Sequence, residues 1–173
     1  MSSPKTSSSG ANPVSRCVLI GVDGSDHSDK ALRYYLDWLV RPNDSVTLFC
    51  VIEPPSLPAF SITSLSSVPT EEWGKIMQTR VLELANIENN SLADCLAKRV
   101  NARFLTQDAS HVGEAIVKQA DKQAADLVVL GSRGLGAVKR TILGSVSDYV
   151  LHHIDRPVCV IPQASYSARR SNK

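Results

Sequence analysis

Residues 126–134 read DLVVLGSRG, and the fold class follows from this short pattern. Asp126–Leu130 is an apolar run with β-branched residues, which is typical of a strand buried on both faces of a parallel sheet. Glycine follows at 131 and again at 134, although glycine loses more backbone entropy on folding than other residues. A tight turn, a close approach to a ligand or a phosphate-binding loop would justify that cost. We therefore expect a central strand followed by a loop that carries function.

The rest of the chain alternates similar apolar runs with segments in which apolar residues recur at helical spacing. The expected strands are Arg16–Val22, Asp44–Ile52, Val100–Thr106, Asp126–Leu130 and Pro157–Ile161, and the expected helices are Ser25–Val40, Thr70–Lys98, Gly113–Gln123 and Ser145–Ile154. Strands that alternate with helices need crossover connections, so the sheet should be largely parallel, with helices on both faces. The sequence thus predicts a doubly wound α/β domain of five strands. In such a sheet a ligand binds at the carboxyl ends of the strands, where the winding reverses.

Two features in the middle of the chain interrupt this regular pattern. The segment Pro54–Pro69 is rich in proline and serine, which predicts a surface loop. In the helix that follows, Trp73, Ile76 and Met77 begin an apolar stripe that we expect to belong to the core. The asparagine pair at 89–90 could loosen that helix near its middle.

The glycine-rich loop does not match three known phosphate-binding patterns. A Walker loop needs a lysine directly after its second glycine, but Ala137 follows Gly136 here. The dinucleotide fingerprint follows the first strand and needs a third glycine where this loop has Lys139. A flavodoxin-type loop would also follow the first strand, and residues 23–30 there read DGSDHSDK, whose three aspartates would repel a phosphate.

The pattern that remains is Gly131-x2-Gly134-x9-Gly144-Ser145. Without a side chain, Gly131 would let a flat ring or a ribose lie against the backbone, and Gly134 would permit the turn away. Gly144-Ser145 opens a helix, whose free N–H groups and positive dipole end attract an anion. The hydroxyls of Ser145 and Ser147 would add donors. One end of the loop therefore suits a nucleoside, and the other end suits its phosphates.

Simpler interpretations of the same residues stay open at this point. The three glycines could serve turn and cap geometry alone, and Asp23 could simply cap the helix that follows it. Lys139 and Arg140 could screen phosphate charge or belong to a solvated loop.

Taken together, these motifs resemble the ATP-binding subgroup of the universal stress protein family. The segments that carry the resemblance are VLIGVDGSDHSDKAL at 18–32, ADLVVLGSRG at 125–134 and GSVSDYVLHHIDRPVCVIP at 144–162, together with the glycine spacing. The resemblance covers nearly all of Arg16–Pro162. It implies a Rossmann-like sheet of strand order 3-2-1-4-5, whose winding reverses between the first and fourth strands.

The resemblance also implies a ligand and the residues that hold it. The ligand would be ATP, with ADP and AMP as alternatives, and Mg²⁺ held mainly by the phosphates rather than by a dedicated set of protein ligands. Asp23 would contact the nucleoside or assist through a metal, and Val51 would offer backbone groups to the adenine edge. The ribose and phosphates would lie against Gly131, Ser132, Gly134, Gly144, Ser145, Val146 and Ser147. The last strand would pair with a second copy, so we expect a homodimer through Val158–Ile161.

Charge and composition argue against several other classes of protein. The net charge is +2 over 173 residues, but the first 13 residues carry +1 and the last 11 carry +3, which leaves −2 for the body. A slightly acidic body argues against nucleic acid as the main partner. The four cysteines have no CxxC spacing and read as small buried residues of a reduced compartment.

We expect a cytoplasmic protein with no membrane segment, because no apolar run is long enough to cross a bilayer. The expected organisation is a flexible tail at 1–14, a nucleotide-binding domain at 15–162 and a basic tail at 163–173. The function that these patterns favour is an ATP-binding stress-response module acting as a nucleotide-dependent dimeric switch or interaction protein. The alternatives are a slow ATPase or phosphotransfer enzyme, for which no general base stands out, and a nucleotide-free chaperone-like protein.

Overall fold

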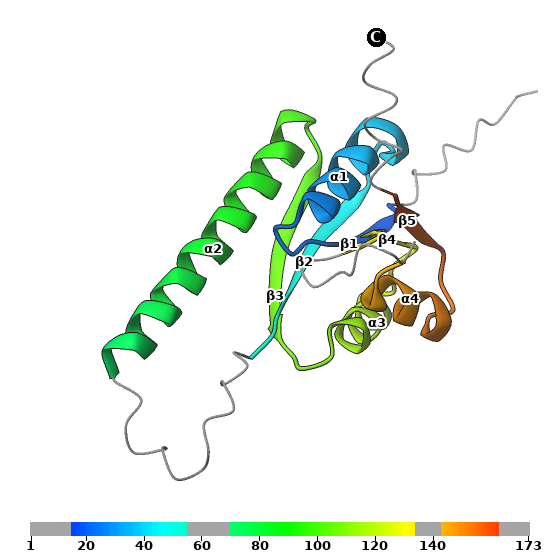
Figure 1. The fold of residues 1–173 in the computed structure, drawn as a ribbon. Helices are drawn as coiled ribbons and strands as arrows, with labels where there is room; N and C mark the ends of the chain where they lie inside the picture. Colours follow the sequence, from blue (N-terminus) through cyan, green and yellow to red (C-terminus); the bar gives the residue numbers. More distant parts are fainter. Residues whose placement is uncertain (1–14, 55–69, 134–142, 163–173) are drawn as a thin grey trace, which may run out of the picture.

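The computed structural model of the chain describes residues 15–54, 70–133 and 143–162. Its centre is a parallel sheet of strand order β3-β2-β1-β4-β5, which confirms the predicted doubly wound architecture (Figure 1). The strands are β1 (Cys17–Gly21), β2 (Ser45–Ile52), β3 (Asn101–Asp108), β4 (Leu127–Gly131) and β5 (Val158–Ile161). The winding reverses between β1 and β4, so their carboxyl ends border a crevice where a ligand can enter.

The central strands are buried on both faces, as their unbroken apolar runs predict. Val18, Leu19 and Ile20 of β1 are completely buried, and so are Val128 and Val129 of β4. β1 and β4 pair in register, with Val18 opposite Leu127. Alternate residues of these strands therefore feed two separate cores, one on each side of the sheet.

Helices cover both faces of the sheet. The α-helices are α1 (Asp26–Tyr34), α2 (Thr70–Ala97), α3 (Val112–Lys122) and α4 (Ser145–His153). α1 and α2 lie over one core, and α3 and α4 lie over the other, as Figure 1 shows. Each expected helix is present, and its ends differ from the prediction by one residue or a few.

The first helix begins at a side-chain cap and ends in a wider turn. Ser25 is the N-cap, and its hydroxyl accepts a hydrogen bond from the Ser28 amide at 3.2 Å. The helix then continues as the π-helical turn η1 (Tyr35–Leu39), in which the Val40 amide bonds to the Tyr35 carbonyl at 2.9 Å. The sequence pattern located this helix but did not signal the change of pitch.

Two expectations about α2 are wrong. The helix runs unbroken through the asparagine pair at 89–90, because Leu92 and Cys95 beyond it pack into the core and hold the C-terminal half in place. The apolar stripe near its start is not core, since Ile76 and Met77 are 46% and 49% exposed. The side chain of Trp73 lies outside the described residues. Burial thus begins only where the helix meets the sheet.

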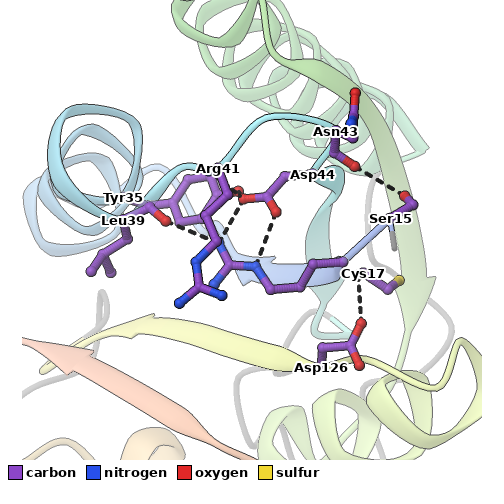
Figure 2. A network of polar contacts seen from close by, with 9 residues as sticks. Ser15, Cys17, Tyr35, Leu39, Arg41, Asn43, Asp44 and Asp126 are labelled. Atoms are coloured by element: carbon purple, nitrogen blue, oxygen red, sulfur yellow. Dashed lines mark hydrogen bonds and ion pairs between the residues drawn. The ribbon is translucent and has the colours of Figure 1, made fainter. Parts of the chain in front are cut away.

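A polar network lies at the end of the sheet where the strands begin, away from their carboxyl ends (Figure 2). The buried carboxylate of Asp44 receives two hydrogen bonds from Arg16, at 2.6 and 3.0 Å, and one from the Tyr35 hydroxyl at 2.5 Å. The Arg41 amide adds a fourth at 2.9 Å. Burial alone would raise the pKa of Asp44, but these donors favour its charged form and lower the pKa below its usual value. The network therefore ties β1, η1 and the start of β2 together.

Several sequence-based expectations can be compared with the described residues. All four cysteines lie among them, and each is a free thiol. No described helix is both long enough and apolar enough to cross a bilayer. The tails at 1–14 and 163–173, the loop expected at Pro54–Pro69 beyond its first residue, and Gly134, Lys139 and Arg140 lie outside the described residues.

Candidate functional site

A cavity of about 950 Å³ lies at the carboxyl ends of β1, β2 and β4. This volume is at the upper end of the range for small-molecule sites. All the predicted site residues within the described ranges except Ser132 line it, namely Asp23, Val51, Gly131, Gly144, Ser145, Val146 and Ser147. Ser132 is buried directly behind the wall. The fold thus brings together residues that are more than 120 positions apart in the chain.

The turn between β1 and α1 holds Asp23 in a fixed position. One carboxylate oxygen of Asp23 accepts hydrogen bonds from the amide and the hydroxyl of Ser25, at 3.0 and 2.6 Å. Gly24 has a φ of +76°, and a Cβ there would lie 2.9 Å from the side chain of Ile87 in α2. The turn therefore needs glycine both for its conformation and for the close approach of α2. Asp23 supports the start of α1 and also lines the cavity.

The end of β2 presents backbone groups to the cavity. Phe49 accepts a hydrogen bond from the Val22 amide at 3.0 Å, so its carbonyl points toward β1. Ile52 accepts one from the Ala109 amide at 3.1 Å, so its carbonyl points toward β3. Because backbone groups alternate in direction along a strand, Val51 directs its N–H and C=O to the β1 side, beyond the point where β1 ends. Among the described residues neither group has a backbone partner there, so both can meet a ligand.

Gly131 has a packing role as well as a place in the cavity wall. A Cβ at this position would lie 2.7 Å from the carbonyl oxygen of His27 in the first turn of α1. The missing side chain therefore faces the backbone of α1, where the sequence pattern had suggested a ribose or a ring. The next residue, Ser132, donates from its amide to the Ile161 carbonyl of β5 at 3.0 Å and accepts from the Gly144 amide at 2.5 Å. Ser132 thus links the last strand to the beginning of α4.

The N-terminus of α4 opens into the same cavity. Gly144 is its N-cap, and no backbone acceptor for the amides of Ser145, Val146 and Ser147 is found among the described residues. Such amides, at the positive end of the helix dipole, attract an anion. The hydroxyl of Ser147 is buried and donates to the Gly144 carbonyl at 3.0 Å, so it is not the outward donor that the sequence suggested. Ser145 is exposed and lines the cavity.

Sequence reasoning missed the two side walls of the cavity. Leu84 and Ile87 line it from α2, and Val112 and Ile116 line it from α3. These residues looked like ordinary core positions, because an apolar stripe does not show whether it faces a sheet or a cavity. Two cations, Arg80 and Arg133, also line the cavity.

The whole chain can now be compared with known proteins. The model of the universal stress protein family matches residues 15–162. The chain belongs to the universal stress protein family. A universal stress protein from Mycolicibacterium smegmatis is 31% identical over 159 residues, which cover 88% of this chain and 51% of the relative. The chain therefore spans about half the length of that relative.

Other universal stress proteins match over nearly their full length. MJ0577 from Methanocaldococcus jannaschii is 26% identical over 153 residues, covering 83% of this chain and 93% of MJ0577. Its solved structure has a TM-score of 0.62 at 22% identity, with 85% and 95% of the two chains covered. An Arabidopsis thaliana universal stress protein solved with AMP bound has a TM-score of 0.62 at 18% identity, covering 85% of this chain and 91% of that one.

Two further structures of the family hold a cyclic or deoxy nucleotide. A universal stress protein in complex with cAMP has a TM-score of 0.56 at 18% identity, covering 86% of this chain and 98% of that one. The Archaeoglobus fulgidus protein in complex with dAMP has a TM-score of 0.54 at 15% identity, covering 85% and 97%. At these identities the likeness shows a shared fold.

Proposed function

We propose that this universal stress protein binds an adenine nucleotide, ATP in the first place, in the cavity at the β1/β4 switch point. Binding would control a dimeric switch or partner contact in a stress response. One observation carries the proposal: the backbone groups of Val51 and the amides at the start of α4, which have no backbone partner among the described residues, belong to residues that line the same cavity. A nucleotide has a base at one end and phosphates at the other, so one molecule would use both sets of groups.

The backbone of Val51 favours adenine over guanine. Adenine has an amino donor beside a ring acceptor on its Watson–Crick edge, and these match the C=O and N–H of one residue. Guanine has the opposite arrangement on that edge, so it would face like groups and leave them unpaired. A site built on such hydrogen bonds rejects the mismatched base strongly. The structures of relatives with AMP, cAMP and dAMP support an adenine ligand.

The phosphates would lie at the N-terminus of α4. The amides of Ser145, Val146 and Ser147 would donate to phosphate oxygens, and Gly131 and Ser132 would lie beside the ribose and the first phosphate. The described residues contain no cluster of three or more histidine, cysteine, aspartate or glutamate side chains that could hold a metal ion. We therefore assign Mg²⁺ mainly to the phosphates, with Asp23 as the nearby carboxylate.

A dimer would form through β5, which lies at one edge of the sheet. An exposed apolar edge strand is a site where a second chain can pair. Ser132 bonds to Ile161 of that strand and to Gly144 at the start of α4, so it provides a path from the phosphate site to the edge. Sedimentation with and without ATP tests this part, and a clean monomer at micromolar concentration under both conditions would contradict it.

The binding proposal is tested by identifying the small molecule released when the purified protein is denatured, and by titrating the ligand-free protein with ATP, ADP, AMP and GTP. We expect an adenine nucleotide in the released fraction and saturable binding of ATP. We expect GTP to bind at least about a hundredfold more weakly. No saturable binding of any adenine nucleotide would reject the proposal.

A further inference from the structure

The N-terminal half of α2 stands away from the sheet. Figure 1 shows α2 meeting β3 near its C-terminal end and diverging from it toward its N-terminal end. Exposure follows the same course, because Cys95 is buried and Leu84 and Ile87 are half-buried, whereas Val81 is 66% exposed. The residues of the diverging half that face the sheet line the cavity. This half of the helix therefore forms a cavity wall with little core behind it.

One polar contact fastens this wall. Arg80 donates from Nη1 to the carbonyl oxygen of Glu53 at 2.7 Å. Within the described part of the chain, it is the one side-chain bond between residues 74–83 and the strands or strand ends. Glu53 directly follows β2 and lies two residues beyond Val51, whose backbone groups face the cavity. The contact thus joins the loose half of α2 to the end of the strand that would read the base.

We infer that Arg80 is a positioning residue for the nucleobase. By holding α2 against the end of β2, it keeps Met77 and Val81 of the loose half over one side of the base slot, opposite Val112 and Ile116 on the other. The inference rests on the proposed adenine nucleotide site and assigns to it a residue that no motif marks. A flat base makes van der Waals contacts with both walls, so its binding weakens when one wall moves away. The phosphates, which lie at α4, do not depend on this wall.

The test replaces Arg80 with methionine, which keeps an apolar stem and removes the donors. Titration with ATP should show a dissociation constant about tenfold higher than that of the wild type. Inorganic tripolyphosphate, which has no base, should bind both proteins equally. Arg80→Lys, which can still donate to the Glu53 carbonyl, should recover part of the lost ATP affinity.

The matched control is Lys75→Met, which removes one positive charge from an exposed position of the same helix that does not line the cavity. It should leave ATP affinity unchanged. Hydrogen exchange gives an independent measurement, because amides of 74–83 should exchange faster in Arg80→Met than in the wild type while those of β1 and β4 stay protected.

Equal ATP affinity of Arg80→Met and the wild type would overturn the inference and leave the nucleotide site standing. So would an equal loss for ATP and tripolyphosphate, because a role at the base end cannot produce it. Failure of the wild-type chain to bind any adenine nucleotide would overturn both the proposed function and the inference.

Discussion

The two ends of the cavity are built in different ways. At the end that we propose for the phosphates, Gly131 packs against the His27 backbone, and the Gly144 amide donates a 2.5 Å hydrogen bond to the Ser132 carbonyl. At the end that we propose for the base, α2 diverges from the sheet (Figure 1), and among the described residues one arginine joins its loose half to the end of β2. The first end is set by tight packing of main chain, and the second by a side-chain contact between α2 and the end of β2.

This difference indicates that substitutions at the packed end should change the stability of the protein, whereas substitutions at the open end should change ligand affinity. A group added at the packed end collides with backbone, which cannot move cheaply. A group changed at the open end alters a surface that a ligand shares with solvent. A variant should therefore be able to change the free energy of unfolding without changing ligand affinity, or the reverse, depending on the end of the cavity in which it lies.

The largest effect should come from Gly131→Val at the packed end. The new side chain would begin 2.7 Å from the His27 carbonyl oxygen, so α1 or β4 must shift. We expect the free energy of unfolding to fall by about 3 kcal/mol, as measured by urea denaturation. Gly74→Ala in the loose half of α2 is the control, because a Cβ there has no neighbour within 4 Å and alanine favours a helix. Similar losses in the free energy of unfolding for the two variants would contradict the view that only the Gly131 end is tightly packed.

The next largest effect should be on binding, from Ser145→Glu. The side chain is exposed at the first position of α4, where an acidic residue suits the helix dipole, so stability should stay within about 0.5 kcal/mol of the wild type. The added charge would occupy the place of the phosphates. We expect ATP affinity to drop about a hundredfold by calorimetry, which corresponds to about 2.7 kcal/mol. The neutral control Ser145→Gln should lose at most about threefold, and an equal loss would show that charge is not the cause.

A third prediction concerns the Asp44 network at the start of the strands. It serves as a reference because it lies away from both ends of the cavity. Asp44→Asn leaves buried Arg16 and Tyr35 donors poorly satisfied and should cost about 2 kcal/mol of stability. The pKa of Asp44 is lower in the folded protein than in the unfolded chain. The ionised carboxylate therefore contributes its full stability above the unfolded-state pKa of about 3.9, and this contribution is lost as pH falls through the folded-state pKa. The wild type should therefore lose stability below about pH 4, and the variant should lose less in that range. Urea denaturation across pH 2–6 measures both, and parallel pH profiles would contradict the assignment.

The smallest effect should be seen in the reactivity of two buried thiols. Burial raises the pKa of Cys50 and of Cys95 to about 11, so both should react slowly with alkylating reagents at neutral pH. Both thiols belong to the same core cluster, but Cys50 also lines the cavity, whereas Cys95 does not. ATP should slow the labelling of Cys50 a few-fold beyond its effect on Cys95, as followed by mass spectrometry. Equal protection of both thiols would indicate global stabilisation instead of a ligand beside Cys50.

The fold was predictable because its signals are local. The runs in β1 and β4 are apolar on both faces, which only a covered parallel sheet accommodates, and Ser25 caps its helix in the ordinary way. The start of α4 was predictable for the same reason, since a glycine followed by serines is a common beginning of a helix, and Gly144 is the N-cap there. Arg80 was not, because nothing near it in the sequence shows that a carbonyl 27 residues earlier will lie beside it.

By itself, the sequence determined the order of strands and helices along the chain, the buried centre of the sheet and the start of α4 after Gly144. These depend on hydrophobic periodicity and on backbone preferences that act over a few residues. Only the tertiary structure decided that Gly131 makes room for the backbone of α1, that the hydroxyl of Ser147 turns inward, and that Met77 near the start of α2 lines a cavity instead of the core. Each of these depends on which segment packs against which, and that is fixed by contacts between residues far apart in the chain.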